Sequence, residues 1–429
     1  MQGWSILGIL RVERKAGSPV DEPSEFASRP SAAHDEKTLV ANSASSCAPP
    51  SLDFQDSSGI PVRIASGNLS GAGRFLAECR PLSREEWDAI LSEFRDANLY
   101  QTWTYAAARW GGKNLSHLVL RDGTALVGAA QLVLVKLPVL DGGLAYVKWG
   151  PLWNRRGSDA DPEIFRQLLR ALRQKYAVER GFLLRVTPWE FENAELQSIA
   201  REEGFRRNVS AQQQTAVLDL TYSLDELRAS LTRHWRSNLK RAESNCLEIV
   251  ESSTEDLLDE FAELYRQMRE RKDAGWIPPI HYLHQIQREL NPGMKAYVSL
   301  CRHQGRTVAG LVVSALGEKS FAWLAATGDA GLEVRGSYLL QWRAIQRLKS
   351  RGVRSYDLGG INEVTHPGTA QYKLGLCGKR GRVANYLGEF EACEAWTSRL
   401  VIKGTDRFRL ALIRVQQFAQ EHWRSRVAR

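Results

Sequence analysis

The sequence predicts an α/β protein in which two similar domains follow one another, each with a mixed β-sheet flanked by helices. The first observation is that the order hairpin, strand, helix, strand occurs twice along the chain. The second is that residues 117–134 resemble residues 297–316, with Gly128 matching Gly310. The third is composition: 429 residues, 43% hydrophobic and 25% charged, suit two or three globular domains and exclude a fibrous or wholly disordered chain.

Residues 1–75 are expected to form a disordered leader. From residue 14 to residue 74 the chain is rich in Ser, Ala, Pro and Asp and has little hydrophobic periodicity. Such a segment cannot bury enough apolar surface to offset the entropy lost on ordering. Residues 1–10 are apolar, but they lack the preceding positive residues and the small-residue cleavage site of a secretory signal.

Residues 76–210 form the predicted first domain. Ser83 caps a helix at residues 83–97 whose large apolar side chains fall on one face. The pair Asp122-Gly123 between two apolar runs predicts a β-hairpin. The other expected elements are a helix at 102–110, a strand at 144–153, a helix at 161–180, a buried strand at 182–188 and a helix ended by Gly204.

Residues 211–395 form the predicted second domain, which includes a helical insertion at residues 224–290. Within the insertion, a spacing of three and four residues places Arg233, Arg236 and Lys240 on one helical face. A hairpin then leads into a βαβ unit. Its two strands are expected at residues 321–327 and 355–358, and its helix at residues 337–351.

A glycine-containing loop at residues 328–336 precedes the helix of this unit. The first turn of a helix has free N–H groups and a positive dipole end, so the loop suits a phosphate or pyrophosphate group. The alternative is that Gly331 and Gly336 only make the turn, because no G-x-G or G-K-S spacing is present.

Residues 396–429 are predicted to form a basic amphipathic helix in which arginines surround an apolar stripe. Packing against the domain is the first expectation. Contact with anionic lipid and contact with tRNA phosphate are the alternatives, and the net charge of +9 permits a polyanionic partner without requiring one. The stripe consists of Phe408, Leu412, Val415, Ala419 and Trp423.

Residues 357–378 contain the groups best suited to catalysis. Asp357 stands where a strand ends, a position at which α/β proteins open crevices. Lys373 follows Tyr372 and is flanked by glycines, so its ammonium could approach a polarised carbonyl and stabilise the oxyanion formed by an attacking amine. The alternative is an ordinary solvated lysine.

Neither covalent nor metal-dependent catalysis is indicated. The chain has no G-x-S-x-G elbow, and Cys377 has no histidine at an informative spacing. The six cysteines are scattered without C-x-x-C, and the eight histidines lack companions at ligand spacing, so no metal is expected. Scattered cysteines also fit a reduced, cytoplasmic protein, and residues 126–140, the longest apolar stretch, are too short to span a bilayer. Direct transfer between two bound substrates therefore fits best.

Three passages together resemble a known family. They are YQTWTYAAARWGG at 100–112, HWRSNLKRAE at 234–243 and, most specifically, GSYLLQWRAIQRLKSRGVRSYDLGGINEVTHPGTAQYKLGLCG at 336–378. The chain from about residue 80 to 395 resembles the Fem-type branch of the Gcn5-related N-acyltransferase superfamily. The resemblance implies tandem duplicated acyltransferase domains and transfer of an aminoacyl or acyl group to an amine of a cell-envelope precursor, such as a peptidoglycan stem peptide.

The resemblance also implies roles for individual residues. Lys373 would lie at the carbonyl under attack, with Tyr372 as its packing partner, and Asp357 is a candidate base. The acceptor, a nucleotide-sugar or lipid-linked precursor, would be bound at the inner face of the membrane or in the cytoplasm. The residues that would bind it are Arg109, Trp110, Arg236, Lys240 and Tyr282.

Two acyl donors remain open, and neither is a tightly bound cofactor. Aminoacyl-tRNA is one, although the long coiled-coil arm of some tRNA-dependent members is absent. Acyl-coenzyme A is the other, although its binding loop is reduced to Val334, Arg335, Gly336 and Ser337, of which the last three would contact the donor. The rival functions are a coenzyme A-dependent N-acyltransferase acting on a sugar or small amine in polysaccharide synthesis, and a non-catalytic module that binds a polyanion.

Overall fold

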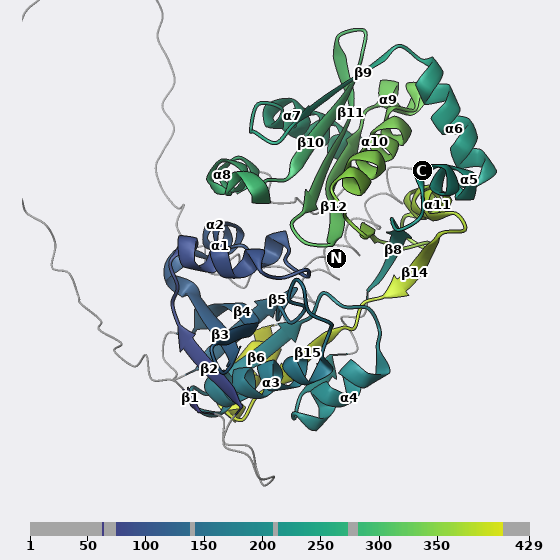
Figure 1. Cartoon of the computed structure of the whole chain (residues 1–429). Helices are drawn as coiled ribbons and strands as arrows, with labels where there is room; N and C mark the ends of the chain where they lie inside the picture. Colours follow the sequence, from purple (N-terminus) through teal and green to yellow (C-terminus); the bar gives the residue numbers. More distant parts are fainter. Residues whose placement is uncertain (1–61, 64–73, 138–141, 209–212, 273–281, 406–429) are drawn as a thin grey trace, which may run out of the picture. The chain divides into compact units, whose positions relative to one another are not determined.

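The computed structural model describes residues 62–63, 74–137, 142–208, 213–272 and 282–405 (Figure 1). The apolar stripe predicted within residues 396–429 and nearly all of the predicted leader lie outside the described residues. Within the leader, Val62–Arg63 forms strand β1, which pairs with the next strand. The described chain is an α/β protein with two mixed sheets, which confirms the predicted fold class.

The first sheet has eight strands. They are β1 (Val62–Arg63), β2 (Phe75–Arg80), β3 (Leu115–Asp122), β4 (Ala125–Lys136), β5 (Gly143–Lys148), β6 (Phe182–Thr187), β7 (Arg206–Asn208) and β15 (Glu389–Ala392). Their order across the sheet is β1-β2-β3-β4-β5-β6-β15-β7. Only β5 and β6 are parallel to each other, and every other neighbouring pair is antiparallel.

Helices cover both faces of the first sheet. Side chains alternate along β3, so Leu118 and Leu120 face the core beneath α3 and α4, whereas Val119 faces the core beneath α1. The predicted cap at Ser83 is confirmed, since its hydroxyl accepts from the Glu86 N–H and the Glu86 carboxylate accepts from the Ser83 N–H. The helices are α1 (Arg84–Ser92), α2 (Trp103–Trp110), α3 (Pro162–Leu172) and α4 (Ala194–Glu202).

The second sheet has seven strands in the order β14-β8-β13-β12-β11-β10-β9. The strands are β8 (Gln214–Asp219), β9 (Leu247–Ser252), β10 (Tyr297–His303), β11 (Arg306–Ala315), β12 (Lys319–Thr327), β13 (Ser355–Gly360) and β14 (Gly381–Asn385). The helices are α5 (Leu224–Ser230), α6 (Arg233–Ser244), α7 (Leu258–Lys272), α8 (Leu283–Glu289), α9 (Asp329–Val334), α10 (Gly336–Ser350) and α11 (Pro367–Cys377).

The two halves repeat the same order of elements. Each has a strand, two helices, a hairpin, a strand, a helix, a parallel strand, a helix and a strand, beginning at β2 and at β9. Gly128 and Gly310 occupy equivalent places, since each pairs with a leucine of the preceding strand, Leu120 in one half and Leu300 in the other. At both glycines an added Cβ would lie within 3 Å of a core side chain.

The predicted helical insertion at residues 224–290 differs from the structure. It contains a strand, β9, at the edge of the second sheet, and helices α7 and α8 occupy the place that α1 and α2 have in the first half. Only α5 and α6 have no counterpart there. The strand was missed because edge strands are half-exposed, and β9 has weak apolar alternation between two charged helices.

The halves exchange one strand each. Strand β8 follows the first half along the chain but lies between β13 and β14 of the second sheet. Strand β15 follows the second half but lies between β6 and β7 of the first sheet. The domain limits of 76–210 and 211–395 remain predictions. Both strands fall within 211–395, where β8 belongs to the second sheet but β15 belongs to the first. No helix among the described residues is long and apolar enough to cross a membrane.

Candidate active site

The second sheet opens between its two parallel strands. Strands β12 and β13 pair only over three residues each, Lys319–Phe321 of β12 with Ser355–Asp357 of β13. In the first sheet, the equivalent strands β5 and β6 pair along all six residues of each. The facing edges of β12 and β13 beyond Phe321 and Asp357 therefore have backbone groups that are not used by the ladder between them, and these groups are available to a ligand.

A bulge at the end of β13 shapes this opening. The register with β8 shifts between Asp357 and Gly360, and Gly359 adopts a φ of 79°. The Asp357 carboxylate accepts hydrogen bonds from the Thr215 hydroxyl, the Tyr386 hydroxyl and, at 2.8 Å, the Gly359 N–H.

Asp357 is 2% exposed, and its burial raises the pKa of the carboxyl, whereas these three donors act in the opposite direction. Because both oxygens are already engaged, the geometry favours a structural role over the candidate base role.

Lys373 lies at the same opening. It is carried by α11, which begins at Pro367, and its Nζ donates to the Gly360 carbonyl at 2.9 Å. A Cβ added to Gly359 would lie 3.5 Å from this nitrogen. Burial lowers the pKa of Lys373, while the nearby Asp357 charge opposes that change. The ammonium is therefore held in place by the backbone, which an ordinary surface lysine is not.

Tyr372 points from α11 towards the start of α10. Its hydroxyl donates to the Ser337 carbonyl at 2.9 Å, and its ring lies 5.0 Å from that of Tyr338 and 5.9 Å from that of Trp235. The Trp235 and Tyr338 rings are 4.8 Å apart. The Trp235 Nε1–H is buried and has no hydrogen-bond partner among the described residues, so it is free to donate to a ligand.

A cavity of about 510 Å³ lies beside these rings. It is enclosed by the first turn of α6, the first turn of α10 and most of α11, so it adjoins the helix start that was predicted to bind an anion. The residues that line it are Thr232, His234, Trp235, Tyr338, Glu363, Pro367, Gly368, Ala370, Gln371, Tyr372, Leu374 and Gly375.

The predicted loop at 328–336 is largely a short helix, α9, followed by Arg335 with a φ of 64°. A Cβ at Gly331 would lie 2.1 Å from the Val308 oxygen, and one at Gly336 would lie 3.0 Å from the Cys301 sulfur. Both glycines are therefore required for packing against the sheet, as the alternative interpretation held. Arg335 is half-buried at the start of α10 and donates to the Leu332 carbonyl.

Three of the five predicted acceptor-binding residues lie together. The Arg109 guanidinium lies over the Trp110 ring at 5.8 Å and the Tyr282 ring at 5.3 Å, where α2 meets α8. Arg109 has no hydrogen bond or ion pair among the described residues, and its Nε is buried. A cation held by aromatic rings without a carboxylate partner is suited to an anionic ligand.

The other two predicted acceptor-binding residues lie on α6, which packs on α10 and α11. Arg236 donates to the Ala229 and Leu231 carbonyls and so satisfies the end of α5. Lys240 is exposed on the same helix. Their part in acceptor binding remains a prediction.

Lys148 is a further candidate residue, which the sequence pattern does not indicate. It ends β5, and its Nζ lies 4.1 Å from the centre of the Tyr100 ring and 5.6 Å from that of Tyr105. Tyr100 in turn stacks on Phe321, the last residue of β12 that pairs with β13. Burial and, secondarily, Arg109 lower the pKa of Lys148 to about 7. The only sequence signal was a lysine at a strand end, within YVKWGP at 146–151.

Among the described residues, no three His, Cys, Asp or Glu side chains are placed to hold a metal ion. At the opening, the Lys373 ammonium is the group suited to bind and stabilise negative charge.

Comparison with known proteins identifies the second half. Residues 227–374 match the family model described as an acetyltransferase (GNAT) domain. The second half of the chain therefore contains a GNAT domain. The matched segment begins within α5, so α5 and α6 belong to the GNAT domain, and it ends one residue after Lys373. None of the curated protein sequences matches the chain.

The fold of the chain is similar to that in the crystal structure of FemX. The TM-score is 0.64 at 16% identity, and the alignment covers 76% of this chain and 99% of FemX. The resemblance to the Fem-type branch is thereby confirmed as a resemblance of fold.

Two further structures align less closely with the chain. L-PGS from Bacillus licheniformis aligns with 14% identity and a TM-score of 0.47, over 76% of this chain and 98% of that one. A tandem GNAT protein from the clavulanic acid biosynthesis pathway aligns with 16% identity and a TM-score of 0.41, over 74% and 98%.

Proposed function

We propose that this GNAT enzyme transfers an acyl or aminoacyl group to an amine of a cell-envelope precursor, such as a peptidoglycan stem peptide. The observation that carries the proposal is the position of Lys373, whose ammonium is fixed by Gly360 where β12 and β13 separate. A donor lying along the open strand edges would bring its carbonyl beside this ammonium.

Lys373 would stabilise the oxyanion. The amine attacks the activated carbonyl carbon, and the carbonyl oxygen takes the negative charge. When the carbonyl reforms, the bond from its carbon to the sulfur or oxygen of the donor breaks, and the leaving thiolate or alkoxide takes up the proton that the amine nitrogen loses. An ammonium has three N–H groups, and the Gly360 carbonyl uses one, so two remain for the oxyanion. Tyr372 would position Lys373, because its bond to the Ser337 carbonyl ties α11 to α10.

The donor that we propose is an acyl thioester of the coenzyme A type. Its diphosphate would bind the first N–H groups of α10, at Gly336 and Ser337, with Arg335 beside them. The aromatic cavity between α10 and α11, with the unpartnered Trp235 N–H, supports a site for another part of the donor.

Aminoacyl-tRNA is the second candidate donor. The observation that favours it is the pair of exposed cations on α6, Arg233 and Lys240, on the helix that contributes one wall of the cavity. Exposed cations of this kind bind phosphate backbones, and the affinity would fall steeply with salt.

The acceptor would be anionic. Arg109, held by Trp110 and Tyr282, supplies a guanidinium without a carboxylate partner in the described part of the chain. Such a group suits the diphosphate of a nucleotide-sugar or lipid-linked precursor, which guanidinium binds with two parallel hydrogen bonds.

The test is turnover by the purified protein with acyl-coenzyme A and aminoacyl-tRNA offered separately, and a uridine-diphosphate-linked muropeptide as acceptor. Product with one donor identifies it. In Lys373→Ala we expect kcat to fall about 100- to 1000-fold with little change in donor KM, because the oxyanion loses a charged donor. Lys379→Ala, which removes an exposed lysine just after α11, is the matched control.

An unchanged kcat in Lys373→Ala would contradict the proposed role of this lysine in stabilising the oxyanion. Product with a sugar or small amine instead of the muropeptide would favour the rival N-acyltransferase. Tight binding of the nucleotide-sugar without product from either donor would contradict the proposed acceptor chemistry.

A further inference from the structure

The helix at residues 396–405 has an unusual outer face. Trp396 and Leu400 are 73% and 65% exposed, which is rare for such large apolar side chains. Arg399 and Lys403 lie on the same side, because positions 396, 399, 400 and 403 fall within about 100° of a helix circumference. One face thus combines two exposed apolar side chains with two cations.

The opposite side of this helix is fixed to the first sheet. Ser398 is fully buried; its hydroxyl donates to the Gly181 carbonyl at 2.7 Å and accepts from the Gly143 N–H at 3.2 Å. Ile402 is 1% exposed. The exposed face is therefore presented by a helix that is anchored by its other side.

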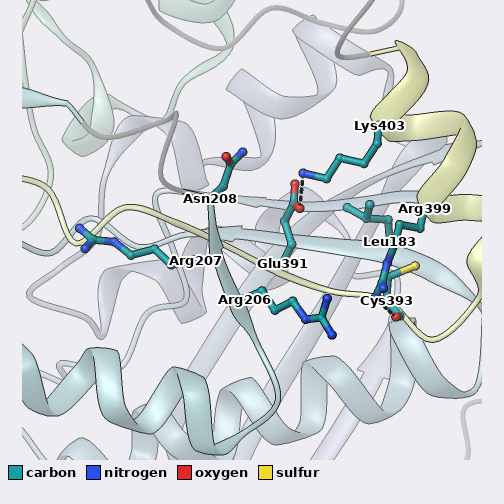
Figure 2. A pocket seen from close by; sticks show the side chains of 8 residues that line it. All are labelled: Leu183, Arg206, Arg207, Asn208, Glu391, Cys393, Arg399 and Lys403. Atoms are coloured by element: carbon teal, nitrogen blue, oxygen red, sulfur yellow. Dashed lines mark hydrogen bonds and ion pairs between the residues drawn. The ribbon is translucent and has the colours of Figure 1, made fainter.

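A cavity of about 510 Å³ lies between this helix and strands β7 and β15 (Figure 2). Arg206, Arg399 and Lys403 line it, while Leu183 and the Cys393 thiol give it an apolar part. The remaining lining residues are Arg207, Asn208 and Glu391.

The cations of this cavity are not neutralised. Arg206 has no hydrogen bond or ion pair among the described residues, and Arg399 donates only to the Cys393 carbonyl. The carboxylate of Glu391 is shared by Lys403 at 2.5 Å and Arg185 at 2.7 Å. Two guanidinium groups therefore line one cavity without a carboxylate of their own, which suits a phosphate group.

Arg207 does not belong to this group. It lies on the other face of β7, pairs with Glu192 at 3.0 Å and points away from the helix in Figure 2. The anionic site is thus defined by Arg206 and Arg399, with Lys403 at its side.

We propose that the face formed by Trp396, Arg399, Leu400 and Lys403 docks on an anionic phospholipid bilayer, with one lipid phosphate in the cavity beside Arg206. Tryptophan and leucine enter the interfacial region of a bilayer, and cations beside them bind anionic headgroups. A soluble phosphate would use only the cations and leave Trp396 and Leu400 in water. A second copy of the chain would bring like charges together across a two-fold interface.

The test is co-sedimentation of the full chain with vesicles of phosphatidylcholine alone and with phosphatidylglycerol added at roughly one part in four. We expect binding to the mixed vesicles only, weakening as salt rises. The double variant R206Q/R399Q should bind about thirtyfold more weakly, because each surface cation contributes about 1 kcal/mol. The matched control R201Q/R306Q removes two exposed arginines outside this face and should bind normally.

The apolar part of the face has its own test. W396S/L400S should bind the mixed vesicles about tenfold more weakly or worse, whereas V178S/V383S, which removes two other exposed apolar side chains, should not. Equal binding to both vesicle types overturns the proposal. Binding of inorganic phosphate by a chain that does not bind vesicles also overturns it. A chain that binds no vesicles but self-associates, with the self-association lost in W396S/L400S, overturns it as well.

Discussion

Lys373 and Lys148 are both lysines withdrawn from water, but their surroundings differ. Lys373 has a carbonyl at 2.9 Å and the negative charge of Asp357 nearby, and both favour the ammonium form. Lys148 has aromatic rings and the cation Arg109 nearby, and no carboxylate pairs with it in the described part of the chain. Lys373 is therefore suited to remain protonated, whereas Lys148 is suited to lose its proton near neutral pH.

We predict that Lys148 makes stability depend on pH. Its pKa is about 7 in the folded chain and about 10.4 when unfolded, so between these values the unfolded chain binds a proton that the folded chain lacks. Stability from this group therefore rises with pH from about 7 to 10 and is lowest below 7. Lys148→Met should remove this slope and be more stable than the parent at pH 6, as measured by urea unfolding at several pH values.

Lys136→Met, at the exposed end of β4, is the control and should keep the parent slope. If Lys148→Met unfolds at the same urea concentration as the parent throughout this pH range, the pKa of Lys148 is not lowered in the folded chain.

The sequence predicted part of this chemistry. Lys373 and Tyr372 could be found because glycines and a strand end surround them in sequence. Lys148 could not, because the rings that hold it, Tyr100 and Tyr105, come from a segment more than 40 residues earlier and meet it only in the folded sheet. Asp357 could also be predicted as a site residue. Its engagement by two hydroxyl donors could not, because Tyr386 and Thr215 lie far away in the sequence.

Helices α6 and α11 meet at a glycine. A Cβ on Gly375 would lie 3.0 Å from Trp235 Cδ1 and 3.1 Å from the Thr232 hydroxyl, and the Gly375 carbonyl accepts from the Thr232 N–H. This close approach places the Trp235 ring in the wall of the cavity. The glycine after Lys373 thus serves the packing of two helices, which in turn shapes the proposed donor site.

We predict that Gly375→Ala destabilises the protein by about 1–3 kcal/mol through overpacking and raises the KM for the donor, because Trp235 must move. Urea unfolding and initial-rate kinetics measure the two effects. Gly293→Ala is the matched control, since an added Cβ there meets nothing within 4 Å and this exposed glycine does not line the cavity. Equal stability and KM in both variants would contradict the packing role of Gly375.

Elements with strong periodicity were predictable, and those formed by contact with distant segments were not. The hairpins and the βαβ unit followed from turn residues and buried strands. Helix α11 is not indicated by the sequence, because His366-Pro367-Gly368 is typical of a turn and the helix has no clear apolar stripe. Its residues pack on β8, β14 and α6. Tertiary contacts, more than local helix propensity, therefore determine that this segment is helical.

At the scale of the whole molecule, the duplication was predictable but the exchange of β8 and β15 was not. Repeated order along the chain reveals two similar halves, whereas strand partners depend on pairing between segments up to about 200 residues apart. The strand that completes the first sheet, β15, therefore comes from the end of the second half.

We predict that Phe390→Ala, in β15, destabilises the first sheet by about 3–5 kcal/mol, although it lies after the entire second half. Phe390 is 3% exposed and packs in the core beneath α3 and α4. Hydrogen exchange should show loss of protection in β6 and β7. The control Val383→Ala, at a half-exposed site on β14, should change neither stability nor protection; unaltered exchange in β6 after Phe390→Ala would contradict the strand assignment.

The exchanged strand also sets an order of events during synthesis. Strands β6 and β7 leave the ribosome about 180 residues before β15, which lies between them in the finished sheet. Until β15 is made, both have an open edge of the kind that pairs with other chains. The half that is translated first is thus the half that is completed last, and its exposure to misassembly lasts as long as translation of the GNAT domain.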